Sequence, residues 1–346
     1  MLMNKAVLTL AFLAATPALA EVPEIMVQAQ VESAPVTGDA DDPAIWVNPA
    51  DPAASLVLGT DKTKGLYVFD MNGAEVSFLE DGNLNNVDIR PFTLAGEQVW
   101  LASAAERGEE KLVFWVIRAD GSIAHASPFA FEGVPAEMAA DVKDIYGSAL
   151  MRDPETGRVA ALVNYKSGDV IQWEVTEQGG TLALTYLRHL KVPSQPEGMV
   201  SDDRAGMLYV GEEDAAIWRF PAWPEGGDEG AVIATVPSDC FPVDDIEGLS
   251  LYDGPEGHYL VASSQGIHRA ALFDLSMEAP ACVGLVGVEA GDVIDGVTET
   301  DGLDVTAVPL GDAFPAGMMV MMDDQNEMFT TGFKYVSFAD ILNQLR

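Results

Sequence analysis

Two acidic residues stand side by side before an apolar segment near the start of the chain. In GDADDPAIWVNPADP, residues 38–52, Asp41 and Asp42 precede Pro43 and the run Ala44–Val47. Adjacent carboxylates repel each other and resist burial unless a positive charge neutralises them. Oxygen ligands without thiolates or paired imidazoles favour calcium over zinc or copper. The alternative is that each acid only caps a turn or faces solvent. The acids that we expect to share calcium are Asp41, Asp42, Glu197, Glu213, Asp245, Glu247 and Asp301.

A small number of basic residues could hold phosphate. The chain has only 18 lysines and arginines, against 55 acids. Lys62 lies in GTDKTKG, Arg90 ends NNVDIR, Arg107 lies in AAERGEEK and Lys166 in NYKSG. Arginine forks and lysine ammonium groups are the usual means of binding phosphate oxygens. The alternative is that they only balance neighbouring acids.

Other catalytic chemistries have no support in the sequence. It contains no G-x-S-x-G, H-E-x-x-H or C-x-x-C motif, and its four histidines are scattered. A covalent mechanism through serine, cysteine or histidine is therefore not indicated. The pairs Met318-Met319 and Met321-Met322 flank Val320 and predict a buried strand.

The elements that must position these residues are β-strands. Short apolar runs bounded by Gly, Asp, Asn or Pro dominate from residue 43 onward, among them GLYVFD, KLVFWVIR and MLYVGEE. Turn signals such as Met71-Asn72-Gly73 join many of them. Only residues 136–142 and 337–346 have helical character.

The strands repeat as units. Comparable openings occur at residues 42, 88, 146, 197, 247 and 301, a spacing of roughly fifty residues that is typical of a four-stranded propeller blade. We therefore predict an all-β fold, a six-bladed β-propeller of four-stranded antiparallel blades, in which the first unit may share strands with the last. Innermost strands start near one mouth of the channel, so the opening residues should form a ring there. These are Asp41, Asp42, Asp88, Tyr146, Glu197, Asp245, Glu247 and Asp301.

The first twenty residues resemble an export signal. Lys5 precedes the apolar run Ala6–Phe12, and Ala18-Leu19-Ala20 is a small-residue cleavage site. We expect residues 1–20 to be a signal peptide, residues 21–346 to be one domain, and the mature protein to be periplasmic or secreted. No other segment is apolar and long enough to span a bilayer.

The charge and the cysteines limit the partners and the compartment. A net charge of −37 argues against nucleic acid and anionic membranes, which require basic patches. Cys240 and Cys282 could pair in an oxidising compartment or remain as two buried thiols. A closed propeller has no evident need of a partner subunit, so we expect a monomer.

Several of these motifs resemble the β-propeller phytases. The resemblance runs in one order from about Gly38 to Lys334, and its motifs are DDPAIW, GLYVFD, NNVDIR, IYGSAL, EEDAAIWRF, DIEGLSLY, YLVASSQG and TDGLDV. It implies a calcium-dependent phytase that hydrolyses phosphomonoesters of myo-inositol hexakisphosphate (phytate) by direct attack of a calcium-activated water. It also implies several calcium ions and a preference for the calcium–phytate complex.

The family's site residues can be placed on this sequence position by position. The carboxylate ligands fall on the seven acids named above, and a backbone carbonyl ligand falls on Val87. The resemblance places substrate contacts on Lys62, Arg107, Tyr146 and Lys166. We assign catalytic roles to Lys62, Arg107, Tyr146, Glu197 and Asp245. We add Arg90 to the substrate contacts.

The chain departs from the family at four places. Ser167 follows Lys166 where an acid or amide is common, and the segments AAERGEE, SSQGIHRAA and DDQNEMFTTGFK also differ. These differences concern the second phosphate site and the rim more than the calcium ring.

Two other functions remain open on the residues alone. A six-bladed calcium-dependent lactonase or esterase would leave Lys62 and Arg107 without a role. A non-catalytic propeller would use calcium only for stability and its face for binding proteins.

Overall fold

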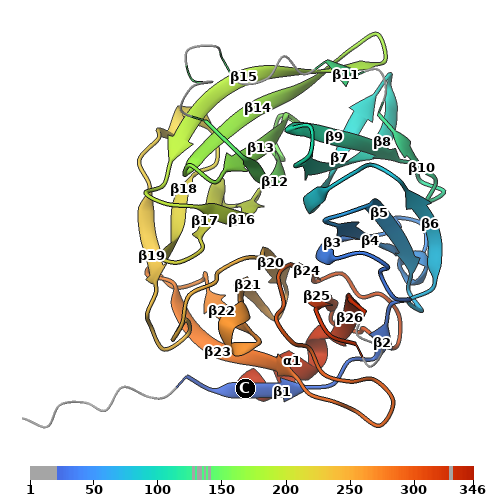
Figure 1. The fold of residues 1–346 in the computed structure, drawn as a ribbon, viewed down its shortest axis with the longest axis vertical. Helices are drawn as coiled ribbons and strands as arrows, with labels where there is room; N and C mark the ends of the chain where they lie inside the picture. Colours follow the sequence, from blue (N-terminus) through green and yellow to red (C-terminus); the bar gives the residue numbers. More distant parts are fainter. Residues whose placement is uncertain (1–21, 127–128, 131–134, 136–137, 139–141, 327–329) are drawn as a thin grey trace, which may run out of the picture.

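The predicted strands form six sheets around a central channel in the computed structural model (Figure 1). The structure describes residues 22–126, 129–130, 135, 138, 142–326 and 330–346. The predicted signal peptide lies outside these residues, as does most of the expected helix at 136–142. Side chains from the innermost strands of all six sheets line the channel. The all-β, six-bladed β-propeller is thus confirmed.

Each blade contains four antiparallel strands, which are arranged in order from the channel to the outside. The inner strands are β3 (Ala40–Trp46), β7 (Leu84–Leu94), β12 (Ile145–Arg152), β16 (Pro196–Asp202), β20 (Leu249–Gly254) and β24 (Leu303–Thr306). The second strands are β4 (Leu56–Asp61), β8 (Glu97–Glu106), β13 (Val159–Tyr165), β17 (Met207–Glu212), β21 (Gly257–Ser264) and β25 (Met318–Asp323). The third strands are β5 (Gly65–Asp70), β9 (Lys111–Ile117), β14 (Asp169–Gln178), β18 (Ala216–Pro221), β22 (Arg269–Asp274) and β26 (Gly332–Ser337). The fourth strands are β6 (Glu75–Leu79), β10 (Ile123–His125), β15 (Thr181–Lys191), β19 (Ala231–Thr235), β23 (Ala281–Val288) and, from the N-terminal part, β2 (Val31–Glu32).

The N-terminal segment closes the ring. Strand β2 pairs with β26 and completes the sixth blade, so the first and last parts of the chain share a sheet as expected. The prediction of four strands per blade is incomplete for two blades, because β1 (Glu24–Val27) adds to β23 and β11 (Phe129–Ala130) adds to β15. Both additions are parallel. They cover outer edges that would otherwise expose unpaired backbone groups.

Lys334 lies at the closure. Its ammonium group is fully buried and forms ion pairs with Glu32, Asp295 and Asp323, the last at 3.2 Å. Asn326 Oδ1 accepts a further hydrogen bond from it at 2.8 Å. These partners come from β2, from the segment before β24 and from the sixth blade, so one cation ties the two ends of the chain together.

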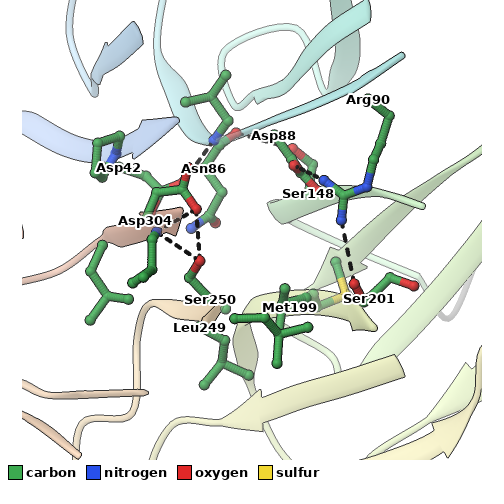
Figure 2. Close-up of a pocket in the computed structure, with 17 residues that line it drawn as sticks. Asp42, Asn86, Asp88, Arg90, Ser148, Met199, Ser201, Leu249, Ser250 and Asp304 are labelled. Atoms are coloured by element: carbon green, nitrogen blue, oxygen red, sulfur yellow. Dashed lines mark hydrogen bonds and ion pairs between the residues drawn. The ribbon is translucent and has the colours of Figure 1, made fainter. Parts of the chain in front are cut away.

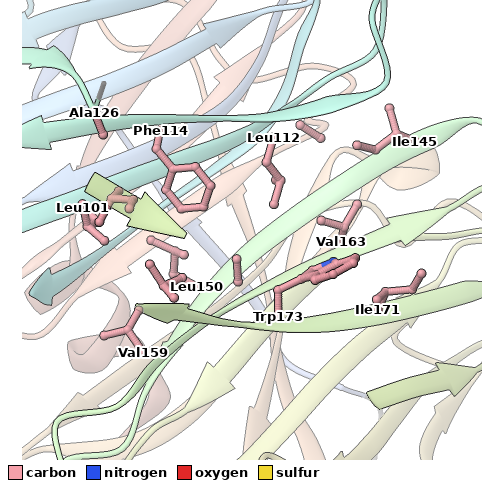
Figure 3. Packing of buried hydrophobic residues seen from close by; sticks show 14 of the residues in the cluster. Leu101, Leu112, Phe114, Ala126, Ile145, Leu150, Val159, Val163, Ile171 and Trp173 are labelled. Atoms are coloured by element: carbon pink, nitrogen blue, oxygen red, sulfur yellow. The ribbon is translucent and has the colours of Figure 1, made fainter. Parts of the chain in front are cut away.

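The cores lie between neighbouring blades. Strands of adjacent blades present apolar faces to each other, and six buried clusters result among the described residues. Figure 3 shows one, in which Leu101 and Phe114 of the second blade pack against Leu150 and Trp173 of the third. Each fully buried side chain of this size contributes about 1.5–3 kcal/mol. These interfaces fix the angle between blades and so the geometry of the channel.

The predicted methionine strand serves two of these clusters. All of β25 is buried. Met319 and Met321 face the cluster shared with the fifth blade, whereas Met318 and Met322 face the cluster shared with the first. The alternation follows from the two-residue period of a strand.

Several smaller features complete the fold. The expected C-terminal helix is α1 (Phe338–Leu345), which buries Phe338, Ile341 and Leu342. In the part of the chain that the structure describes, three short 3-10 helices lie at Pro52–Ala54, Pro224–Gly226 and Gln265–Ile267. Cys240 and Cys282 form a disulfide, which resolves the alternative left open by the sequence. Among the described helices, none has the length and apolar character of a membrane span.

Candidate functional site

The mouth of the channel is shaped by β-bulges. The pairing register shifts between Ala40 and Pro43 in β3, and again at the start of β7, β12 and β16. A bulge inserts extra residues into a strand and redirects its side chains. The residues at these irregularities are Asp41, Asp42, Asn86, Tyr146 and Glu197, while Glu247 and Asp301 stand just before β20 and β24.

Glycines allow these positions to crowd together. A Cβ on Gly147 would lie 2.2 Å from the Glu197 carbonyl oxygen, and one on Gly198 would lie 1.9 Å from that of Glu247. A Cβ on Gly302 would lie 2.1 Å from Asp42 Oδ1. Each glycine follows a residue of the predicted ring, and its Cα lies close to residues of the next blade. Only glycine permits this approach, which brings carboxylates of different blades close to one another.

Asp41 and Asp42 also join the first two blades. Asp41 Oδ2 accepts a hydrogen bond from Asn86 N, and Asp42 Oδ2 accepts one from Val87 N, both at 2.9 Å. Burial and the neighbouring Asp41 raise the pKa of Asp42 well above its usual value. The pair thus helps to join two blades, a structural role that the sequence did not reveal. The two buried carboxylates also remain close enough for the charge of Asp41 to disfavour ionisation of Asp42.

Three further acids of the ring also have raised pKa values. Burial and the Asp41 charge raise the pKa of Glu197 to about 8. Burial and Glu197 raise the pKa of Glu247 to about 12, and burial raises that of Asp301 to about 6 despite Lys62. Lys62 Nζ pairs with Asp301 and lies 3.3 Å from Asp41 Oδ1. One ammonium group therefore serves several buried carboxylates.

An unsatisfied oxygen indicates room for a further positive charge. Glu197 is 1% exposed, and its Oε1 accepts a hydrogen bond from Asn85 Nδ2 at 2.8 Å. Its Oε2 is buried and has no hydrogen-bond partner among the described residues. A buried acceptor of this kind is costly unless it binds a donor or a cation. The oxygen-only donors and this unpaired atom fit a calcium ion.

A second acidic cluster lies beside the ring. Oxygens of Glu213, Asp214 and Asp245 lie within 4.8 Å of one another. Gln195 Nε2 holds Glu213 through bonds of 2.7 and 2.8 Å. Asp245 has φ 90°, a left-handed conformation that is unusual for a residue with a side chain. Burial raises the pKa of both Glu213 and Asp245.

Asp214 was not among the predicted ligands. The sequence signal for it was the run Glu212-Glu213-Asp214, of which only Glu213 was expected to bind calcium. The structure separates them, because Glu212 Oε1 accepts from Ser194 N and its Oε2 from Trp218 Nε1, both at 2.7 Å. Glu212 therefore fixes the blade, whereas Glu213 and Asp214 lie close to Asp245 in the second cluster.

The predicted phosphate contacts meet in a pocket next to the ring. Lys62, Arg107 and Lys166 line a cavity of about 440 Å³. Two of them lie against the Tyr146 ring, with Arg107 Cζ 5.2 Å and Lys166 Nζ 4.1 Å from its centroid. Burial and the Glu197 charge raise the pKa of Tyr146, so its hydroxyl remains a hydrogen-bond donor. The pocket can accept more than one anionic group.

Acids also line this cavity. Asp39, Glu110 and Asp144 stand at its wall among the three cations. The mixture suits a polyanion that arrives with bound cations better than a bare polyanion.

Arg90 does not join the pocket. It lies within the channel, where its Nη1 is 2.5 Å from Asp88 Oδ1 (Figure 2). Its Nε is 2.8 Å from Asp203 Oδ2. Asp88 likewise lies along the channel wall, where Oδ2 accepts from Leu150 N at 2.9 Å. The expectation that Asp88 belongs to the ring is therefore corrected, since Asn86 takes the corresponding place in the second blade. Both acids offset the Arg90 charge, so it is poorly placed to bind substrate.

Figure 2 shows that the opposite side of the channel is also polar. Asp304 Oδ2 accepts a hydrogen bond from Ile45 N at 2.8 Å, and its Oδ1 accepts one from Ser250 Oγ at 2.7 Å. Burial raises the pKa of Asp304 to about 6. Asp304, like Asp42 and Asp88, therefore pairs with a backbone amide on the inner strand of the next blade.

Thus the predicted residues fall into three groups. Asp41, Asp42, Glu197, Glu247 and Asp301 crowd at the mouth of the channel, with Val87 beside Asp42. Glu213 and Asp245 form the second cluster with Asp214. Lys62 borders both the ring and the cationic pocket, which contains Arg107 and Lys166 beside Tyr146.

Known proteins resemble this chain in sequence. Residues 1–346 match the protein family described as Phytase. A 3-phytase from Bacillus subtilis (strain 168) is 38% identical over 329 residues, which covers 92% of this chain and 85% of that protein.

A solved structure shares the fold. An auxiliary nutrient binding protein from Bacteroides thetaiotaomicron superposes with a TM-score of 0.53, covering 91% of this chain and 75% of that one. Its 9% sequence identity limits the comparison to the arrangement of strands.

Proposed function

The chain belongs to the phytase family, and from this premise we propose that it is an exported, calcium-dependent phytase that releases phosphate from calcium–phytate. The observation that carries the calcium requirement is the group of buried carboxylates at the channel mouth, with the unpaired Oε2 of Glu197 among them. Family membership favours this function over a lactonase or a non-catalytic propeller.

The residues that would hold calcium are Asp41, Asp42, Glu197, Glu247 and Asp301 in the ring, and Glu213, Asp214 and Asp245 beside it. We propose several ions, because the acids form two groups, and we retain the Val87 carbonyl as a further ligand. Bound calcium would neutralise phosphate oxygens and lower the pKa of a nearby water.

The chain's own residues would bind and orient the substrate. Lys62 and Arg107 would hold the phosphate that is removed and stabilise the negative charge that develops on it. Lys166 and Tyr146 would hold a neighbouring phosphate, since the Lys166 ammonium group lies 4.1 Å from the centre of the Tyr146 ring and lines the same pocket as Lys62 and Arg107. The described histidines lie outside this pocket, and we propose direct attack by water without a phosphoenzyme.

Export is supported by two features. Residues 1–20 have the pattern of a signal peptide. The Cys240–Cys282 disulfide fits an oxidising compartment such as a periplasm or the extracellular medium. We propose that the mature protein acts there as a monomer.

A phosphate-release assay tests the calcium requirement. With calcium–phytate as substrate, we expect activity to disappear after complete chelation with EDTA and to return when calcium is added in excess. The raised pKa values of the ring acids give the reason, because these carboxylates cannot all be ionised together without cations. Phosphate release that persists without calcium would contradict the proposal.

A further inference from the structure

Lys166 is carried by a tightly constrained turn. Gly168 N donates to the Tyr165 carbonyl oxygen at 2.8 Å, and Lys166 N donates to the Asp144 carbonyl oxygen at 3.0 Å. Gly168 has φ 94°, and a Cβ there would lie 2.4 Å from the Val192 carbonyl oxygen. The turn therefore has little freedom to rearrange, and the direction of the Lys166 side chain depends on its neighbours.

Behind this turn lies a carboxylate with three partners. Asp169 is only 3% exposed along its side chain. Its Oδ2 accepts from Ser167 Oγ at 2.5 Å and from Lys191 Nζ at 2.9 Å, and its Oδ1 lies 2.6 Å from His189 Nε2. Lys191 Nζ also donates to the Ser167 carbonyl oxygen at 2.9 Å. Burial raises the pKa of Asp169, but the hydrogen bonds from Ser167, Lys191 and His189 outweigh it and lower the pKa overall.

This network connects the body of the blade to the pocket. Asp169 begins β14, and His189 and Lys191 lie on the neighbouring strand β15. They hold Ser167, which is the residue next to Lys166. The Lys166 ammonium group lies over the Tyr146 ring and forms no ion pair with a described residue. The charge of Lys166 is thus available to a ligand, provided that the turn is held.

We propose that Asp169 is a positioning residue that fixes Lys166 over Tyr146 and so sets the affinity for substrates with two neighbouring phosphates. The inference rests on the proposed function, in which Lys62 and Arg107 bind one phosphate and Lys166 binds the next. A substrate with a single phosphate does not need Lys166. The role of Asp169 is therefore confined to polyphosphates.

The experiment compares Asp169→Asn and Ser167→Ala with the unaltered protein. Asp169→Asn removes the charge that holds Lys191 and His189, and Ser167→Ala removes one hydrogen bond with little risk to folding. Glu174→Gln is the matched control, because Glu174 lies on the same strand and pairs with Arg158 at 2.8 Å, outside the pocket. Melting temperatures show whether each variant is folded.

Steady-state kinetics and calorimetry provide separate measurements. For calcium–phytate, we expect Asp169→Asn to raise KM about tenfold with kcat within about twofold, the pattern of lost binding without lost chemistry. Ser167→Ala should act in the same direction with a smaller effect. For p-nitrophenyl phosphate, which has one phosphate, KM should not change. Calorimetry with myo-inositol hexasulfate, a polyanion that is not a phosphate ester, should show about the same loss of affinity.

The outcomes separate the two proposals. Unchanged hexasulfate affinity in folded Asp169→Asn, or a loss that is equal for single-phosphate and polyphosphate substrates, would overturn the positioning role. If the unaltered protein released no phosphate from phytate, the proposed function would fail. Hexasulfate binding by Asp169→Asn and Glu174→Gln would still decide the role of Asp169.

Discussion

Lys334 at the ring closure and Lys62 at the channel mouth are both held by carboxylates, but the balance of charge around them differs. Lys334 is 0% exposed, and its three acids and one amide all point to it. Lys62 is 22% exposed and pairs with Asp41 and Asp301, while Glu197 and Glu247 lie nearby with raised pKa values. All three acids of the first group pair directly with their lysine, whereas Glu197 and Glu247 of the second group form no ion pair with Lys62.

The comparison shows how similar residues give stability in one place and function in another. At the closure, the partners of the ammonium group come from both ends of the chain, so the ion pairs hold the ring shut. At the mouth, bulges and glycines force together acids from several blades, and the resulting repulsion makes the site a receptor for cations. Burial of a lysine beside acids therefore does not by itself indicate a role.

The largest expected effect is at the closure. Replacement of Lys334 by Met should destabilise the fold by about 3–5 kcal/mol, because it leaves buried carboxylates without their cation. Thermal and urea unfolding would measure the loss, and phosphate release per folded molecule should be kept. Lys111→Met is the control, since Lys111 pairs with Glu109 at the surface and should leave stability unchanged. Equal stability of the two variants would show that the closure does not depend on Lys334.

The next effect is on activity at the mouth. We expect Lys62→Ala to lower kcat for calcium–phytate by about 10²–10³-fold, the usual cost of losing one group that stabilises transition-state charge. The melting temperature in calcium should change little. Lys64→Ala is the control, because Lys64 lies in the same turn but donates to the Thr37 carbonyl oxygen at 3.0 Å and to Thr37 Oγ1 at 2.7 Å. If both variants retain activity, Lys62 has no catalytic role.

The sequence was sufficient to predict the ring but not all its members. Asp41, Glu197 and Asp301 could be found because they open repeated units, and equivalent positions in a propeller lie at the same mouth. Asp88 was misplaced because a bulge between Asn85 and Val87 adds a residue, and a shift of one residue turns a side chain to another face. The pairing that produces a bulge is not visible in the sequence of one strand.

The basic residues show a related limit. Arg107 and Arg90 both follow an acid-containing strand segment, yet Arg107 lies in a loop at the mouth and Arg90 in an inner strand within the channel. Each also has a partner from another blade, Asp203 for Arg90 and the Tyr146 ring for Arg107. Such contacts are set by packing between units that are distant in sequence.

The smallest effect concerns the dependence of stability on pH, and it again separates the two sites. Without calcium, the raised pKa of Glu197, about 8, means that the folded protein binds more protons than the unfolded chain from about pH 4.5 to 8. Stability should therefore fall as pH rises through this window, by at most about 1.4 kcal/mol per pH unit for this group. Calcium should remove the slope, because it favours the ionised acids.

Urea unfolding at several pH values measures this slope in calcium-free and calcium-saturated protein. Glu197→Gln is the informative control, since it keeps the size of the side chain and cannot ionise, so its calcium-free slope should be smaller. The closure should contribute none of the difference, because its acids pair with Lys334 with or without calcium. A slope that is the same in both conditions would mean that the ring acids do not bind the added calcium. The excess of acids around Lys62, compared with Lys334, would then have to serve substrate binding alone.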